Sequence, residues 1–327
     1  MKTLRWAMVG TGFMSTLILK DFAHVKNSEL AVLASRDPER AKARLESEGV
    51  TADTATFQEV LLDPTIDIVY VATPHSEHFW QAKAALEAGK HVLVEKAFTM
   101  NAAEARQLRD LAKAKNLFLM EAMWTKFLPV HQEIFRRVRE GAIGNIKIIE
   151  GNFGFFMEFD NNHRLFNFEL GGGSALDQGV YPTTFCHWYA GSRLLSQVTH
   201  GENFANGADA HVETFLRYEN NVTGIALSSL ITSLGVAGRI VGDKGEVEFL
   251  GTFFNPDGAL IKGLTGMGEK PSVEEVKIPK LGAGYAHMLQ EVVDCINAGK
   301  IESDIHPLTF TIEIMELLDE ARAQING

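Results

Sequence analysis

The stretch VGTGFMS, residues 9–15, decides the fold of this chain. It follows an apolar run that is typical of a buried strand, and it precedes a helical pattern. Gly10 permits a tight turn, Gly12 lets the backbone approach a pyrophosphate, and Ser15 takes the third small position. Because the turn begins a region that alternates strands and helices, we interpret it as a dinucleotide-binding turn rather than a simple strand-to-helix connection. The expected cofactor contacts in this turn are Gly10, Gly12, Phe13, Met14 and Ser15.

The first 120 residues alternate apolar runs with helical patterns, which predicts right-handed βαβ units and a parallel sheet. The strand-like runs span residues 5–9, 30–34, 68–72, 91–94 and 117–120, and the helical patterns include 38–48 and 81–88. Gly89 follows the second of these helices as an expected C-cap. These patterns predict a Rossmann domain at residues 1–122.

After about residue 145 the segments are rich in β-branched and aromatic residues, which predicts a mainly antiparallel sheet. The expected strands span residues 146–155, 210–218, 222–229, 238–241 and 246–250, with turn-like separators at 219–221, 242–245 and 255–258. A helix at residues 128–139 bridges the two regions, and a last helix spans 308–324. We therefore expect an α/β protein whose second, α+β domain covers residues 123–327, with the last helix able to pack back on the first domain.

The composition excludes several classes of protein. With 46% hydrophobic and 22% charged residues, the 327-residue chain has an ordinary globular composition. Its net charge of -11 argues against nucleic acid as a partner, since phosphate neutralisation requires a basic surface. Cys186 and Cys295 form no metal-binding or disulfide pattern and fit a reducing compartment. No apolar stretch is long enough to span a bilayer, so we expect a cytoplasmic protein with no metal site and no membrane contact.

The end of the second strand, SRDP at residues 35–38, predicts the preferred coenzyme. An acidic residue at this place would bind the ribose hydroxyls of NAD, whereas Arg36 suits the 2′-phosphate of NADP. Asp37 is an alternative ribose-binding acid, but an aspartate before a proline is better explained as a helix N-cap. Arg40 or Arg44, on the following helix, can join the phosphate site. NADP is thus favoured over NAD, and the expected contacts are Ser35, Arg36 and Arg40.

Two further strand ends carry polar residues where open α/β sheets bind ligands. Thr73 and Pro74 follow one strand and are expected beside the dinucleotide, with Ser76 able to cap the next helix. His75 and His78 follow, and histidines there are more often on the helix surface than catalytic; we include His78 among the cofactor contacts. The other strand end carries Glu95 and Lys96, and both are expected at the cofactor.

Four segments resemble the Gfo/Idh/MocA family of dinucleotide-dependent oxidoreductases: GTGFMS (10–15), ATPHSEH (72–78), GKHVLVEKAF (89–98) and GGGSALDQGVYP (171–182). Residues 120–129 and 140–155 are similar to the family's branch of dimeric dihydrodiol dehydrogenases and NADP-dependent xylose dehydrogenases. The resemblance implies a Rossmann domain, an open-faced second sheet that packs against a partner subunit, and a place for Lys96 beside the nicotinamide. Ala97 departs from the family's proline. A cis bond before a non-proline residue costs about 3–4 kcal/mol, so we expect a trans Lys96–Ala97 bond or a strained cis one.

The segment at residues 171–182 predicts a flexible turn, a Ser174 N-cap and a helix. Asp177 and Tyr181 are four residues apart and therefore share one helical face. Gly179 and Pro182 weaken this helix, which indicates that something approaches it closely. A buried tyrosine with a hydrogen-bonded aspartate is the structural alternative, whereas the resemblance places both residues in the active site.

The resemblance suggests a catalytic hypothesis for these groups. Tyr181 would exchange the alcohol proton, while the ammonium of Lys96 favours the phenolate and polarises the substrate oxygen. Asp177 would orient the substrate or keep Lys96 charged. Lys96 is an alternative acid/base, and the sequence does not separate the two.

Aromatic residues near the domain junction predict a substrate wall, although such residues are more often core. Trp124 is the best candidate, Phe127 and Phe156 are further ones, and we expect Phe155 and Arg164 to contact substrate as well. The sequence thus predicts an NAD(P)-dependent dehydrogenase or reductase, with NADP preferred, acting on a cyclic diol, sugar or polyol as a homodimer or higher oligomer. The alternatives are a ketosugar reductase, such as an anhydrofructose reductase, and a non-catalytic dinucleotide-sensing regulator.

Overall fold

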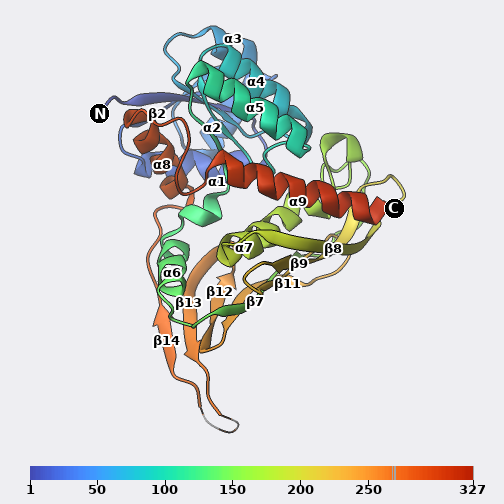
Figure 1. The fold of residues 1–327 in the computed structure, drawn as a ribbon. Helices are drawn as coiled ribbons and strands as arrows, with labels where there is room; N and C mark the ends of the chain where they lie inside the picture. Colours follow the sequence, from blue (N-terminus) through green and yellow to red (C-terminus); the bar gives the residue numbers. More distant parts are fainter. Residues whose placement is uncertain (267, 269, 327) are drawn as a thin grey trace. The chain divides into compact units, whose positions relative to one another are not determined.

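The computed structural model describes residues 1–266, 268 and 270–326, and its chain forms two compact units (Figure 1). Unit 1 comprises Met1–Phe127 and Lys280–Met315, and unit 2 comprises Leu128–Pro279 and the chain from Glu316 onward. The division after Phe127 lies close to the boundary expected at residue 122. The return of residues 280–315 to unit 1 is more extensive than the return of a last helix alone.

Unit 1 contains a six-stranded parallel sheet in the order β3-β2-β1-β4-β5-β6. This is the strand order of a dinucleotide-binding Rossmann fold, so the predicted fold class is confirmed for this unit. The strands are β1 (Leu4–Val9), β2 (Ser28–Ala34), β3 (Asp53–Ala55), β4 (Ile68–Val71), β5 (His91–Val94) and β6 (Leu119–Glu121). The helices are α1 (Phe13–Ile18), α2 (Pro38–Glu48), α3 (Phe57–Leu62), α4 (His75–Glu87), α5 (Ala102–Lys115) and α8 (Tyr285–Asn297), with 3-10 turns at Leu19–His24 and Trp124–Phe127.

Local capping explains where two of these helices begin. Asp37 accepts hydrogen bonds from the backbone N–H groups of Glu39 and Arg40, so the predicted N-cap of α2 is confirmed. Helix α4 begins at His75, six residues earlier than expected, because Pro74 supplies the extended residue before the helix. The predicted Ser76 cap is wrong, since this serine already lies inside the helix.

A buried carboxylate attaches residues 280–315 to unit 1. Asp21 accepts hydrogen bonds from the backbone N–H groups of Ala283, Tyr285 and Ala286, at 2.8, 2.7 and 3.0 Å. These N–H groups lie at the start of α8, where no intrahelical acceptor exists. Gly282 has a φ of 56°, and a Cβ there would lie 2.0 Å from the Asp21 carboxylate. The contact therefore requires both the carboxylate of Asp21 and a residue without a side chain at position 282.

Unit 2 contains an eight-stranded sheet in the order β14-β13-β12-β11-β7-β10-β9-β8. Among the described strands of this second sheet, only β7 and β10 pair in parallel, so the predicted mainly antiparallel sheet is confirmed. The strands are β7 (Ile146–Gly154), β8 (Leu194–Asn203), β9 (Asp209–Tyr218), β10 (Thr223–Ser229), β11 (Gly235–Gly242), β12 (Gly245–Thr252), β13 (Asn255–Gly263) and β14 (Val273–Val276). The predicted separator at 255–258 is wrong: residues 253 and 254 make the turn, and Asn255 already pairs with Thr252 in the ladder.

Helix α7 (Val180–Ala190) packs against strands β7 and β10, and glycines on these strands make room for it. A Cβ at Gly151 would lie 3.0 Å from Pro182, and a Cβ at Gly224 would lie 3.0 Å from Cys186. Helix α6 (Pro129–Arg139) contacts β13, and the last turns of α9 (Leu308–Asn326) belong to this unit. The sheet therefore carries its helical cover on one face.

No helix within the described ranges combines the length and the apolar character needed to cross a membrane. The same residues contain no group of three or more histidine, cysteine or carboxylate side chains arranged to hold a metal ion. Cys186 and Cys295 are both buried free thiols.

Candidate active site

The turn after β1 is shaped as the glycine pattern predicts. Gly10 has a φ of 119°, and a Cβ there would lie 2.2 Å from the carbonyl oxygen of Ala72 at the end of β4. Only glycine fits this contact, because both the backbone conformation and the space exclude a side chain. A Cβ at Gly12 would meet no atom within 4 Å, so the backbone there faces open space. The turn thus offers the close backbone approach that a dinucleotide pyrophosphate requires.

The other residues expected in this turn differ in exposure. Phe13 is 68% exposed, Met14 is half-buried and Ser15 is buried. The Ser15 hydroxyl donates to the carbonyl oxygen of Gly12 at 2.6 Å, so its small side chain stabilises the turn itself.

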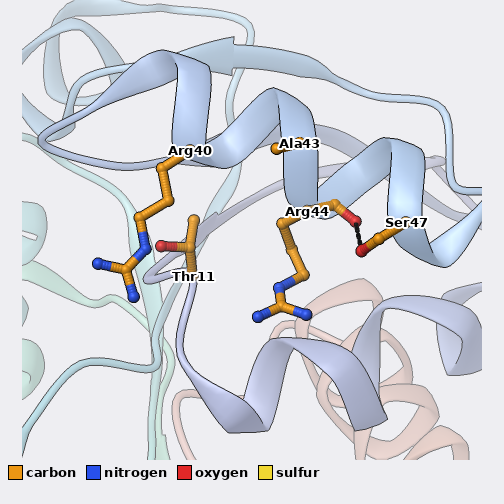
Figure 2. A pocket seen from close by; sticks show the side chains of 5 residues that line it. All are labelled: Thr11, Arg40, Ala43, Arg44 and Ser47. Carbon is orange, nitrogen blue, oxygen red and sulfur yellow. Dashed lines mark hydrogen bonds between the residues drawn. The ribbon is translucent and has the colours of Figure 1, made fainter.

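A cavity of about 260 Å³ lies beside this turn in unit 1 (Figure 2). Arg40 and Arg44 extend into it from α2, and Thr11 closes its other side. Arg44 contacts Glu48 at 3.4 Å. In the part of the chain that the structure describes, the guanidinium groups of Arg36 and Arg40 have no hydrogen-bond or ion-pair partner. Arg40 lines the cavity, and Arg36 follows β2, whose last residue, Ala34, accepts the backbone N–H of Gly10 at 2.9 Å. Guanidinium groups without a partner near a dinucleotide turn fit an additional phosphate. Ser35 accepts a hydrogen bond from the backbone N–H of Asp37.

The two histidines of α4 are buried, and the expectation of surface positions is wrong. His75 is 6% exposed and His78 is fully buried; α4 begins at His75, and both histidines are among its buried residues. His78 Nδ1 lies 2.9 Å from the carbonyl oxygen of Ala97, and its Nε2 lies 2.8 Å from that of Thr73. Burial lowers the pKa of His78, which favours the neutral ring. The residue therefore joins two strand ends, and its contact with a cofactor stays a prediction.

Glu95 is a buried carboxyl group at the end of β5. Tyr70 donates a hydrogen bond to its Oε1, and the backbone N–H of Lys96 donates to its Oε2 at 3.2 Å. Burial raises the pKa of Glu95 to about 7, although the Tyr70 hydrogen bond and the Lys96 charge act in the opposite direction. Glu95 is 3% exposed, so it supports the loop around Lys96 from within the unit.

Lys96 is half-buried at this strand end, and its peptide bond to Ala97 is cis, so the trans alternative is wrong. Glu121, on β6, fixes the loop from the other side. Its Oε1 accepts from the backbone N–H of Phe98 at 3.2 Å, and its Oε2 lies 2.9 Å from His306 Nε2. The loop that carries Lys96 is thus held by hydrogen bonds on both sides.

A buried charged cluster extends from Glu121. Lys126 is 2% exposed, its ammonium lies 3.9 Å from the ring centroid of Phe310, and burial lowers its pKa to about 7. The hydroxyl of Thr311 lies 3.1 Å from His306 Nε2. Sequence patterns missed this cluster because Glu121 and Lys126 meet a segment that is distant in the chain, with His306 185 residues beyond Glu121.

Trp124 and Phe127 are buried in unit 1, at 3% and 5% exposure. The Trp124 ring stacks on Tyr285, with ring centroids 4.2 Å apart. The structure thus gives Trp124 a packing partner in its own unit, and its contact with substrate stays a prediction.

In unit 2, Asp177 and Tyr181 come from a π-helical segment, Ala175–Gly179, that continues into α7. Ser174 stands at the predicted N-cap position, but its side chain makes no capping hydrogen bond. Ser174 has helical φ and ψ, its hydroxyl donates to Asp209 at 3.1 Å, and the Asp209 carboxylate accepts the backbone N–H of Ala175 instead. A distant aspartate thus performs the capping role, which no local pattern reveals.

The close approach predicted at the glycine of this segment comes from strand β10. A Cβ at Gly179 would lie 3.0 Å from the hydroxyl of Ser228. Strand β10 thus explains why a residue without a side chain stands at position 179. On β7, Gly151 likewise makes room for Pro182.

The structure brings Arg164 to Asp177. Arg164 Nη1 donates to Asp177 Oδ1 at 3.0 Å. Tyr181 is 7% exposed and packs against Phe153 and Phe254, with centroid distances of 5.8 and 5.1 Å. The sequence indicated Arg164 and Asp177 separately as substrate contacts but did not predict the ion pair between them.

Two further aromatic residues expected near substrate belong to unit 2. Phe155 packs on a cluster of Leu165, Phe166 and Leu230, while Phe156 is 69% exposed. Phe155 therefore contributes to the packing of this unit, and its contact with substrate stays a prediction.

Comparisons with known proteins agree with this geometry. Residues 4–123 match the family described as "Oxidoreductase family, NAD-binding Rossmann fold", and residues 131–248 match the GFO/IDH/MocA C-terminal domain. A D-xylose 1-dehydrogenase (NADP(+)) from Hypocrea jecorina is 33% identical over 98% of this chain and 92% of its own length. The chain belongs to the Gfo/Idh/MocA oxidoreductase family. The resemblance inferred from the motifs is thereby confirmed.

Other family members match over their full length. The human trans-1,2-dihydrobenzene-1,2-diol dehydrogenase is 29% identical over 98% of this chain and 97% of its own. Among solved structures, an aldose-aldose oxidoreductase from Caulobacter crescentus has a TM-score of 0.87 at 24% identity, covering 99% of this chain and 98% of its own. A levoglucosan dehydrogenase has a TM-score of 0.86 at 20% identity, covering 98% and 97%. These two structures support the fold alone.

The buried Glu95 predicts a pH-dependent stability. Its pKa of about 7 in the folded protein lies above the ordinary value of 4.5, so the folded state retains a proton that the unfolded state loses between these pH values. The stability contributed by the protonated group is full below about pH 4.5 and is lost as pH rises to about 7. We therefore expect Glu95→Gln to gain stability relative to the wild type between pH 5 and pH 8, by at most about 1.4 kcal/mol per pH unit.

The measurement is urea unfolding of both proteins at pH 5, 6, 7 and 8. A stability difference that stays constant over this range would show that Glu95 does not titrate in this way.

Proposed function

We propose that this protein is an NADP-dependent dehydrogenase or reductase that acts on a secondary alcohol or ketone of a cyclic diol, sugar or polyol. The observation that carries the coenzyme preference is a pair of uncompensated guanidinium groups: that of Arg40, which lines the cavity beside the Gly10 turn, and that of Arg36, which follows the end of β2 next to this turn. They suit the 2′-phosphate, while the open backbone at Gly12 suits the pyrophosphate. Thr73 and Pro74 would lie beside the same cofactor.

The catalytic roles rest on the family's motif residues. When bound, the nicotinamide exchanges a hydride with the carbinol carbon. Tyr181 would exchange the hydroxyl proton, and the ammonium of Lys96 would stabilise the phenolate and the developing charge on the substrate oxygen. Lys96 as the proton-transfer group is the alternative within this mechanism. Asp177 would orient the substrate, and Trp124 and Phe155 would contribute to its binding site.

The proposed substrate class follows from the relatives. One acts on D-xylose at carbon 1, and the other is named for a trans-1,2-diol. Both substrates are small neutral molecules in which a hydroxyl group lies on the carbon next to the reacting one. We extend this shared chemistry to the present protein.

The catalytic proposal predicts large losses in turnover. Lys96→Met and Tyr181→Phe should each lower kcat by about 10²- to 10⁴-fold, because a positioned proton-transfer or charge-stabilising group contributes that much. NADP binding, followed by nucleotide fluorescence, should remain. Reduction of NADP by wild-type protein is assayed first with D-xylose and trans-cyclohexane-1,2-diol, and Lys113→Met on α5 is the surface control.

Near-normal kcat in both variants would contradict the roles of Lys96 and Tyr181. Tight coenzyme binding without turnover of any sugar or diol would instead favour a dinucleotide-sensing regulator.

The coenzyme proposal predicts a selective effect of the two arginines. Arg36→Ala and Arg40→Ala should each raise KM for NADP by about 10- to 100-fold, since a hydrogen bond to a charged group contributes about 1.5–3 kcal/mol. KM for NAD should change less than about 3-fold, because NAD lacks the 2′-phosphate. Lys42→Ala is the matched control on the same helix, since Lys42 is exposed and does not line the cavity. Equal losses for both coenzymes would refute the 2′-phosphate assignment.

We also propose that the protein forms a homodimer or higher oligomer through the sheet face opposite α7. On this face Val198, Phe215 and Ile225 stand side by side on β8, β9 and β10. Val198 is 50% exposed and Phe215 is 42% exposed. Beside this apolar row, Arg239 pairs with Glu246 across β11 and β12. An apolar row bordered by charge pairs is typical of a surface that a second subunit covers.

The oligomer proposal predicts that Phe215→Glu converts the protein to a monomer, because a charge in the middle of the apolar row is costly to bury. Light scattering after gel filtration measures the mass. Leu62→Glu is the control, since Leu62 is 84% exposed on α3 of unit 1. A wild-type monomer, or a Phe215→Glu protein of unchanged mass, would refute this interface.

A cytoplasmic location is proposed as well. Its support is the pair of buried free thiols, which fit a reducing compartment.

A further inference from the structure

We propose that Arg164 is the specificity-determining residue that binds the second hydroxyl group of the substrate, and that its pairing with Asp177 selects neutral over anionic substrates. This inference rests on the proposed function, because it presupposes a substrate bound at Asp177 and Tyr181. It assigns recognition to a side chain outside the family's dinucleotide and lysine motifs.

The donor capacity of Arg164 is only partly used within the protein. Its Nη1 donates to Asp177 Oδ1 at 3.0 Å. Over the described part of the chain, its other N–H groups have no acceptor. The Arg164 side chain is 49% exposed, whereas the Asp177 side chain is 12% exposed. A guanidinium carries five N–H donors in a planar fork, so one edge can hold the aspartate while others face a ligand.

The backbone of Arg164 is held in place by the chain around it. The carbonyl oxygen of Arg164 would lie 2.7 Å from a Cβ at Gly172, so this crossing requires glycine. The next residue, Leu165, accepts a hydrogen bond from the backbone N–H of Gly173 at 2.8 Å. Leu165 and Phe166 are buried together with Leu230. The guanidinium therefore extends from a fixed point, which reduces the entropy lost when a ligand binds.

The same segment places Arg164 near the proposed chemistry. Asp177 and Tyr181 are separated by about one helical turn, so a group bound by Arg164 lies on the side of the helix that presents the phenol. A ring whose reacting hydroxyl meets Tyr181 can direct another hydroxyl to the guanidinium. In the substrates of the two relatives, the carbon next to the reacting one carries such a second hydroxyl group.

The charge of the pair determines which group is bound. An isolated guanidinium prefers a carboxylate or phosphate. Here Asp177 compensates the positive charge at 3.0 Å and would repel a second anion brought to the same place. A hydroxyl oxygen accepts a hydrogen bond from the remaining N–H groups without that repulsion. The pair thus recognises a neutral polyol and discriminates against sugar acids and sugar phosphates.

The test uses three cyclohexane probes that differ at one substituent beside the reacting hydroxyl. They are trans-cyclohexane-1,2-diol, cyclohexanol and trans-2-hydroxycyclohexanecarboxylate. For each probe, kcat and KM are measured with NADP, and Kd is measured by calorimetry in the presence of NADPH. The variants are Arg164→Met, Arg164→Gln, which retains neutral donors, and Asp177→Asn. Arg193→Met is the matched control, because Arg193 pairs with Glu219 on the surface of the same unit.

We expect the wild type to bind the diol at least 10-fold more tightly than cyclohexanol. Arg164→Met should reduce this ratio to about 1 through KM and Kd, and Arg164→Gln should give an intermediate ratio. Asp177→Asn leaves the guanidinium uncompensated and should shift the carboxylate-to-diol binding ratio toward the carboxylate by about 10-fold. Arg193→Met should leave both ratios unchanged.

Ratios of Kd that are the same in the wild type, Arg164→Met and Asp177→Asn would overturn the inference, as would the absence of binding by all three probes. Binding with the expected ratios but without turnover would support Arg164 and overturn the proposed enzymatic function. If Arg164→Met unfolds below the assay temperature, Arg164→Gln takes its place in the comparison of diol with cyclohexanol.

Discussion

The contact between Gly10 and the carbonyl oxygen of Ala72 is the constraint on which the arrangement of unit 1 depends. It joins the ends of β1 and β4, the two central strands of the parallel sheet, at a separation that admits no side chain. The carboxyl ends of β2 and β5 lie at this same edge, because parallel strands end together. Arg36 and Lys96 are therefore presented at one edge of one sheet, although they are 60 residues apart.

Buried carboxylates fix the remaining geometry by accepting backbone N–H groups from distant segments. Asp21 holds the start of α8, Asp209 holds the start of the π-helical segment, and Glu121 holds the loop after Lys96. Each replaces a cap or turn bond that the local sequence does not supply. Removal of one such acceptor leaves a buried N–H group unpaired, which costs about 1–3 kcal/mol.

Sequence reasoning predicted the parallel sheet, the glycine turn and the N-cap at Asp37, because each depends on residues a few positions apart. It failed where the partner was distant. Ser174 precedes a helix as a cap would, yet Asp209 takes the N–H group. His78 occupies a polar helix start, yet α4 begins early, at His75, and His78 is fully buried. The sequence likewise did not predict the pairing of Arg164 with Asp177, because Arg164 lies in a loop and no repeating pattern indicates the direction of its side chain.

The uncompensated arginines of unit 1 have a further consequence in a chain whose net charge is -11. A local positive charge on an otherwise acidic molecule attracts a polyphosphate to that site, while the negatively charged remainder of the surface repels it. Steering of this kind acts on encounter frequency and weakens as added electrolyte screens the charges. Under the proposed coenzyme assignment, Arg36 and Arg40 would therefore affect how quickly the protein captures its coenzyme as well as which coenzyme it retains.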